Sequence, residues 1–191
     1  MKTQLLTSKL VLIVISAAIN IIGHQLSSSI NSPIFFDSIG TIISALVAGP
    51  WVALLTGLLS NILSSPISGP VVLAFAPVAM MIGFTAGLLA HAGLFRTLPR
   101  VILSGVTITF TLILIAVPIR VYLFGGTSAS GSDFFIAYLH AVGEGLILSV
   151  SFSVIGANLI DKVLSAIIAW LLVRHLPKNI LQYFPQIAEV R

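Results

Sequence analysis

The sequence LVAGPW, Leu46–Trp51, interrupts the longest apolar part of this chain. No Asp, Glu, Lys or Arg occurs between Asp37 and Arg96. A water-exposed surface needs charged side chains to stay solvated, so an uncharged run of this length predicts burial in lipid. Gly49-Pro50 splits the run and predicts a tight turn between two apolar helices.

The composition places the whole chain in the same class. It is 58% hydrophobic and 7% charged, with a mean hydropathy of +1.15, whereas soluble domains average about 25% charged residues. The net charge of +4 is small, and no basic run interleaved with aromatic residues suggests a nucleic-acid partner. The chain contains no cysteine, which excludes disulfides and thiolate metal sites. We therefore predict a single all-α integral membrane domain over residues 1–191, in contact with lipid.

We predict six membrane helices, with approximate bounds 5–24, 35–48, 52–64, 71–91, 101–123 and 153–175. The second and third are short for a hydrocarbon layer that needs roughly 20 residues. In the fourth, Pro77 predicts a kink, and Gly83 and Gly87 predict close packing against a neighbouring helix. Residues 134–149 are predicted to form a short or partly inserted helix, because one helix over 134–173 would be about 60 Å long.

The basic residues predict an orientation with both termini in the cytoplasm, because cytoplasmic segments are enriched in Lys and Arg. Six helices then place most of the nine Lys and Arg residues on the inner side. A seventh helix would move the basic cluster Arg174–Lys178 to the outer side, so the charge distribution favours six.

Polar residues from distant segments are expected to meet near the outer face. Ionisable groups in or near a membrane are costly, which makes such a group of residues a candidate site for a small polar ligand. The alternative is ordinary interfacial placement together with a structural ion pair. The candidate ligand-binding residues are Asn20, His24, Asp37, Arg120, Tyr122, Asn158, Asp161 and Lys162.

Arg120 is the strongest single candidate, because a guanidinium can hold a carboxylate or phosphate through two parallel hydrogen bonds. It could instead be an interfacial arginine, or the partner of Asp133 or Asp161. Asp161 and Lys162 are consecutive, so their side chains point about 100° apart on a helix. We predict that each meets a different neighbour.

Sequence motifs of enzymes are missing. The chain has no Gly-x-Ser-x-Gly, His-Glu-x-x-His or glycine-rich phosphate-binding motif, and its four histidines are dispersed. We therefore predict a protein without catalytic activity, cofactor or metal. Any ATP that drives its work must be hydrolysed by a partner.

Two segments carry a resemblance to a known family. The pattern LxxGPxxxxxxG, from Leu46 to Gly57, and the segment NLIDKVLSAIIAWLLVRHLP, Asn158–Pro177, resemble the substrate-binding S components of energy-coupling factor (ECF) vitamin transporters. The chain departs from the family in having Ala53 where glycine is frequent, and in lacking an Ala-x-x-x-Ala pattern on the first helix.

The resemblance implies a bacterial cell-membrane protein that binds a water-soluble vitamin or precursor with high affinity from outside. It also implies association with a membrane T subunit and two ATPase subunits. Small residues on the first helix would then let a partner helix approach closely, and Ser16, Ala17 and Ala18 are the candidates.

The identity of the vitamin stays open. Arg120 and Lys162 favour a carboxylate or phosphate, and we lean to pantothenate for this reason. Asp37 and Asp161 would instead suit a cationic or hydroxylated ring such as pyridoxine or hydroxymethylpyrimidine. The alternatives to an S component are a solitary vitamin carrier and a membrane sensor or assembly subunit without cargo.

Overall fold

The structure is a computed structural model that describes residues 2–128, 131–177 and 184. Within these ranges the regular elements are helices, and no strand occurs. Their bounds are α1 Lys2–Ser29, α2 Ile39–Ala48, α3 Pro50–Ser68, α4 Pro70–Ala74, α5 Ala76–His91, α6 Leu98–Pro118, the π-helical turn η1 Ile119–Leu123, α7 Asp133–Ala141 and α8 Leu146–Arg174.

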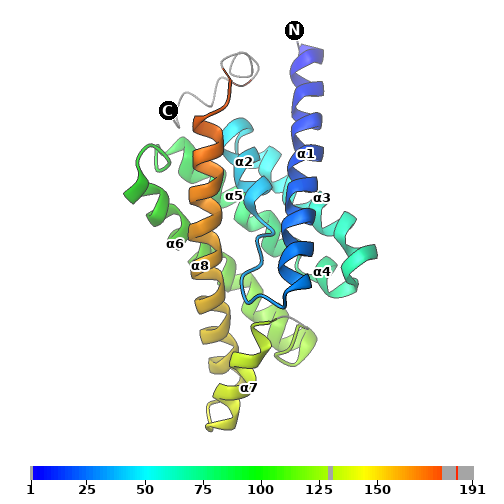
Figure 1. Ribbon diagram of the computed structural model, residues 1–191, viewed down its shortest axis with the longest axis vertical. Coiled ribbons are helices and arrows are strands. Elements are labelled where there is room, and N and C mark those ends of the chain that lie inside the picture. Colours follow the sequence, from blue (N-terminus) through cyan, green and yellow to red (C-terminus); the bar gives the residue numbers. More distant parts are fainter. Residues whose placement is uncertain (1, 129–130, 178–183, 185–191) are drawn as a thin grey trace.

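Four helical segments are long and apolar enough to cross a membrane: Leu6–Ser29, Pro50–Ser68, Leu98–Leu123 and Leu146–Arg174. Two shorter apolar helices, α2 and α5, lie among them. The central element is α2, which packs against α1, α3, α5 and α8 and is buried at eight of its ten residues. In Figure 1, α8 and α1 stand on either side of this centre, with α6 behind α8.

The Gly49-Pro50 turn separates α2 from α3. Gly49 has φ of 86°, in the left-handed region where a side chain is strained. Pro50 begins α3, where its missing N–H would have had no helical partner anyway. The same arrangement recurs at Gly69, with φ of 94°, and Pro70.

Glycines allow α3 and α5 to pack at backbone distance. A Cβ at Gly83 would lie 2.5 Å from the carbonyl oxygen of Ala53, and one at Gly87 would lie 2.3 Å from Cα of Pro50. Gly57 on α3 meets Ala79 in the same way. The predicted close packing at Gly83 and Gly87 is confirmed.

Several boundaries differ from the sequence prediction in the first half of the chain. Helix α1 continues to Ser29, α2 begins at Ile39, and α3 continues to Ser68 with Pro66 inside it. The continuous helix predicted over 71–91 is instead two helices, divided at Phe75. Pro77 lies in the first turn of α5, where a proline starts a helix without breaking a hydrogen bond, so it produces a boundary and not a kink.

The second half contains a short helix and a long one. Helix α7 has nine residues, Asp133–Ala141, and begins one residue before the segment 134–149 for which a short helix was predicted. Helix α8 begins at Leu146, earlier than the predicted residue 153, and its 29 residues extend about 43 Å at 1.5 Å per residue. It packs along α6, and Gly105 on α6 lets the backbone of Val163 approach.

Candidate functional site

A cavity of about 450 Å³ lies between the helices, within the range of small-molecule sites. Its walls come from α1, α2, α3, α4, α5, α6, η1 and α8, together with the loop 30–38 and the described residues 124–128 and 131–132 of a second loop. One part of the lining is apolar and comes from Phe35, Ile67, Val71, Val72, Phe75, Val78, Ala79, Ile82, Leu112, Ala116 and Val154. The other part carries hydroxyl, amide and charged groups.

The two loops touch each other beside the cavity. A Cβ at Gly131 would lie 2.5 Å from the carbonyl oxygen of Asn31 and 2.8 Å from that of Ser32. Only glycine allows this approach, because no side chain fits between the two backbones. The first loop is also tied to α1, where Ser27 Oγ donates a hydrogen bond to the carbonyl of Ile34.

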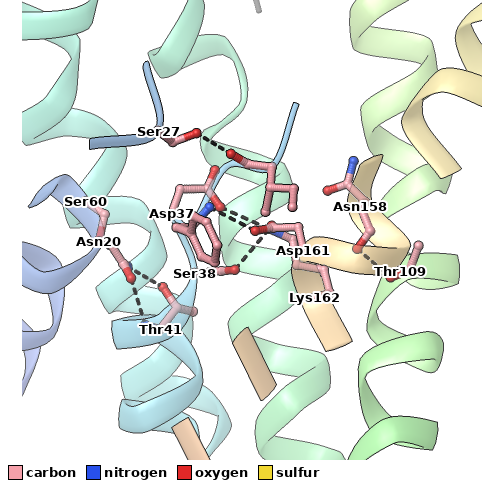
Figure 2. A network of polar contacts seen from close by, with 12 residues as sticks. Asn20, Ser27, Asp37, Ser38, Thr41, Ser60, Thr109, Asn158, Asp161 and Lys162 are labelled. Carbon is pink, nitrogen blue, oxygen red and sulfur yellow. Dashed lines mark hydrogen bonds and ion pairs between the residues drawn. The ribbon is translucent and has the colours of Figure 1, made fainter. Parts of the chain in front are cut away.

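Lys162 is the centre of a buried ionic cluster at the cavity wall, shown in Figure 2. Its Nζ lies 3.0 Å from Oδ1 of Asp37 and 2.9 Å from Oγ of Ser38, and it forms an ion pair with Asp161. The Lys162 and Asp161 side chains are 1% and 0% exposed. The ion pair between Lys162 and Asp37 joins the middle of α8 to the loop before α2.

Asp161 and Lys162 do meet different neighbours, as predicted, namely Phe36 and Asp37, but they also pair with each other, which the prediction did not include. Consecutive helix positions do point apart, but the long, flexible lysine stem bends back so that its ammonium reaches the neighbouring carboxylate. Asp161 also accepts a hydrogen bond of 2.8 Å from the backbone N–H of Phe36. Phe36 has φ of 52°, a strained value for a residue with a side chain, and this bond holds it there.

Asp37 is the accessible carboxylate of the cluster. Its side chain is 41% exposed and lines the cavity, whereas Asp161 lies behind it. Withdrawal from bulk water opposes ionisation, but the charge and hydrogen bond of Lys162 outweigh it, so the pKa of Asp37 is lowered below its ordinary value. Asp37 is therefore an anion at neutral pH.

Arg120 reaches the cavity wall with its guanidinium already engaged. Nε donates to the carbonyl of Gly126 at 3.0 Å, Nη1 donates to Oγ of Ser132 at 3.1 Å, and Nη2 pairs with Asp133. Of the alternatives for Arg120, the structure shows the pairing with Asp133. Tyr122 does not join the site: it is 78% exposed and points away, because residues two apart on a helix face opposite sides.

Asn20 lines the cavity and fastens three helices together. Its Nδ2 donates to Thr41 Oγ1 at 2.7 Å and to Ser60 Oγ at 2.9 Å, while its Oδ1 accepts from the backbone N–H of Gly40 at 2.7 Å. The side chain is 2% exposed and its hydrogen-bonding groups are satisfied. Asn20 thus positions α1, α2 and α3 around the cavity.

Asn158 and His24 also reach the cavity, from α8 and α1. Asn158 Nδ2 donates to the backbone carbonyl of Val154 at 2.9 Å. The backbone carbonyl of Asn158 accepts a hydrogen bond from Thr109 Oγ1. Six of the eight predicted ligand-binding residues, Asn20, His24, Asp37, Arg120, Asn158 and Lys162, therefore line one cavity.

Sequence reasoning missed a row of hydroxyl groups on α3. Ser60, Ser64 and Ser68 all line the cavity. Their spacing of four residues puts them on one face of a helix, so the periodicity would have identified them. Gln25 on α1 also lines the cavity, and its Nε2 donates to Ser68 Oγ at 2.7 Å.

Two of the predicted partner-contact residues lie inside the chain. Ser16 and Ala17 are 1% and 0% exposed, and Gly40 of α2 packs on the carbonyl of Ser16. Their small size serves the contact of α1 with α2, so a second subunit cannot reach them in this conformation. Ala18 is exposed and stays a candidate.

Comparison with known proteins gives one match. A family model described as "ECF transporter, substrate-specific component" matches residues 8–173, which is most of the chain. No curated protein and no solved structure matches.

Proposed function

The chain belongs to the ECF transporter substrate-specific component family, and from this premise we propose that it captures a water-soluble vitamin or vitamin precursor in the 450 Å³ cavity. It is a multi-pass membrane protein and a substrate-binding subunit. In this proposal the protein lies in a bacterial cell membrane. Two partner subunits hydrolyse ATP, and a membrane T subunit transmits that energy.

The observation that carries the proposal is the lining of the cavity. Side chains from both ends of the sequence, from Asn20 to Lys162, meet around one space that combines an apolar wall with fixed polar groups. That combination is typical of sites that bind small molecules. A sensor or an assembly subunit without cargo has no need of such a lining.

We also propose six membrane crossings with both termini in the cytoplasm, α2 and α5 being the short ones. Figure 1 supports this orientation, because α1 begins, α8 ends, and α5 turns into α6 toward the same end of the molecule. That end carries Lys9, Arg96, Arg100 and Arg174, as the enrichment of basic residues on the cytoplasmic side requires. The loop 30–38 and the described residues 124–128 and 131–132 would then face outward.

The test is to identify what the purified protein carries. The protein is expressed in a bacterium, purified in mild detergent and denatured, and the released small molecules are identified by mass spectrometry. We expect one vitamin-class compound per chain, which raises the melting temperature when it is added back. A chain that carries none and is stabilised by no vitamin would exclude cargo binding and favour the sensor.

A second measurement separates the S component from a solitary carrier. Co-expression with the T and ATPase subunits of an ECF module should yield a complex that purifies through a tag on any one subunit. Uptake of the identified vitamin without those subunits would contradict the assignment to an ATP-driven transporter.

A further inference from the structure

We propose that the ligand is a neutral or cationic ring that donates hydrogen bonds, and that the Asp37 carboxylate is its charged anchor. This inference rests on the proposed function, since it assigns a chemical class to the cargo of the same cavity. It depends on which charged groups at the cavity wall still have capacity to bind.

Lys162 has no donor left for a ligand. An ammonium group carries three N–H bonds, and three acceptors surround its Nζ: Asp37 at 3.0 Å, Ser38 at 2.9 Å, and Asp161. A ligand carboxylate would have to displace one of these partners and would meet two fixed carboxylates beside it. Lys162 therefore positions Asp37 and does not bind an anion.

The guanidinium of Arg120 is likewise already bonded to groups of the protein. All three of its nitrogens donate to protein groups, and Asp133 compensates its charge. The residue is 3% exposed. To bind an anion, the guanidinium would have to leave a buried ion pair, which is costly because Asp133 would remain uncompensated.

The remaining charge at the cavity is negative. Lys162 offers one positive charge against the two carboxylates of Asp37 and Asp161. His24 also lines the cavity and acts electrostatically on Asp37. Lys162 contacts Oδ1 of Asp37, and the Asp37 side chain is 41% exposed and lines the cavity, so lone pairs of this carboxylate remain within reach of a ligand. The carboxylate can accept a hydrogen bond from a ligand N–H or O–H.

The apolar wall suits a flat ring. Phe35 and Phe75 line the cavity, and Phe75 is held by stacking on Phe124 with 6.0 Å between ring centroids. A ring placed against this wall can direct amino or hydroxyl substituents to Asp37 and to neutral groups such as Asn158 and Ser60. Pyridine and pyrimidine vitamins have this chemistry. The reason for preferring pantothenate, free Arg120 and Lys162 side chains, does not hold in the structure.

The experiment compares ligands of different charge on the wild-type protein after its carried ligand has been removed. Pyridoxine and hydroxymethylpyrimidine serve as uncharged donor rings, pyridoxine 5′-phosphate as the same ring with an anionic group, and pantothenate as a carboxylate. We expect the best uncharged ring to bind at least tenfold more tightly than either anion in a calorimetric titration.

Variants then test Asp37. Asp37→Asn should weaken the best ring at least tenfold, and Asp37→Glu should restore part of that loss. Glu144→Gln makes the same chemical change at an exposed residue away from the cavity and should bind like wild type. If Asp37→Asn does not fold, the comparison of ligand charges on wild-type protein decides alone.

The outcomes separate the two proposals. A carried or added ligand that binds through a carboxylate or phosphate, with Asp37→Asn unchanged or tighter, overturns the assignment of ligand charge and leaves the vitamin-binding function intact. A protein that carries nothing and that no vitamin stabilises overturns the function, and this inference with it.

Discussion

At the scale of single residues, the fold depends on Lys162. It is the counter-charge of two carboxylates, one of them completely buried. We expect Lys162→Met to lower the free energy of unfolding by about 3–5 kcal/mol, because it leaves charge uncompensated in the interior. Thermal unfolding of the detergent-purified protein measures the loss.

A double variant gives the matched control. Lys162→Met combined with Asp161→Asn removes one charge of each sign and should recover part of the lost stability, so the two changes should not be additive. Equal melting temperatures for wild type and Lys162→Met would contradict the buried cluster.

Asn20 gives a second prediction at this scale. Asn20→Ala removes the partners of Thr41, Ser60 and the Gly40 N–H, all of them buried. A buried group left unsatisfied costs about 1–3 kcal/mol, so the melting temperature should fall clearly. Asn61→Ala, also at the cavity but half-buried, should change it little. A fall of the same size in both variants would argue against Asn20 as the fastening residue.

The sequence indicates which polar residues gather at the cavity, but not how they pair. Lys162 bends toward Asp161 because the loop before α2 brings Asp37 and Ser38 to the same point. That arrangement depends on the position of a loop distant in sequence, and helix geometry alone contains no information about it. Tyr122 fails for a local reason, since its distance of two residues from Arg120 already places it on the opposite face.

At the scale of elements, the contact of α3 with α5 depends on glycine. A Cβ at Gly83 would lie 2.5 Å from a backbone oxygen, and backbone cannot yield as a side chain can. Gly83→Ala should therefore push the helices apart, lower the melting temperature and weaken ligand binding. Gly156→Ala, on α8 with open space around it, should be neutral or stabilising by up to about 1 kcal/mol. Melting curves of the two variants decide, and equal effects would contradict the close contact.

Gly-Pro pairs and helix-facing glycines are readable from sequence because their physical reasons are local. A Gly-Pro pair between two apolar segments, such as Gly49-Pro50, ends one helix and starts the next. Proline marks either a kink or a first turn, and the sequence around Pro77 does not show which, because the choice depends on the break at Phe75 between α4 and α5. Ser60 and Ser64 fall within the helix predicted over 52–64, where their spacing already places them on one face, whereas Ser68 lies beyond the predicted end of that helix.

At the scale of the whole molecule, the proposed orientation can be tested by labelling. The chain has no cysteine, so single cysteines can be introduced without background. Ser28→Cys lies at the cavity and Thr97→Cys in the turn between Arg96 and Arg100, and both residues are exposed. In intact cells, a membrane-impermeant maleimide should label the first and spare the second. The reverse pattern would invert the orientation.

The membrane class and the family follow from the sequence because composition and a few motifs determine them. The shape of the cavity does not follow from the sequence, because its walls come from eight helical elements whose relative placement depends on long-range packing. The charge of the ligand is even harder to predict from the sequence. It depends on whether two cations are already paired, as Lys162 and Arg120 are.

The most direct test of the account is the number of vitamin molecules bound per chain, before and after the cavity is filled. Ala79 lines the cavity, whereas Ala157 on α8 does not, and both are half-buried. The ligand identified by mass spectrometry is titrated into wild type, Ala79→Phe and Ala157→Phe. We predict one molecule per chain for wild type and Ala157→Phe, and none for a folded Ala79→Phe. Undiminished binding by Ala79→Phe would contradict the claim that this cavity holds the cargo.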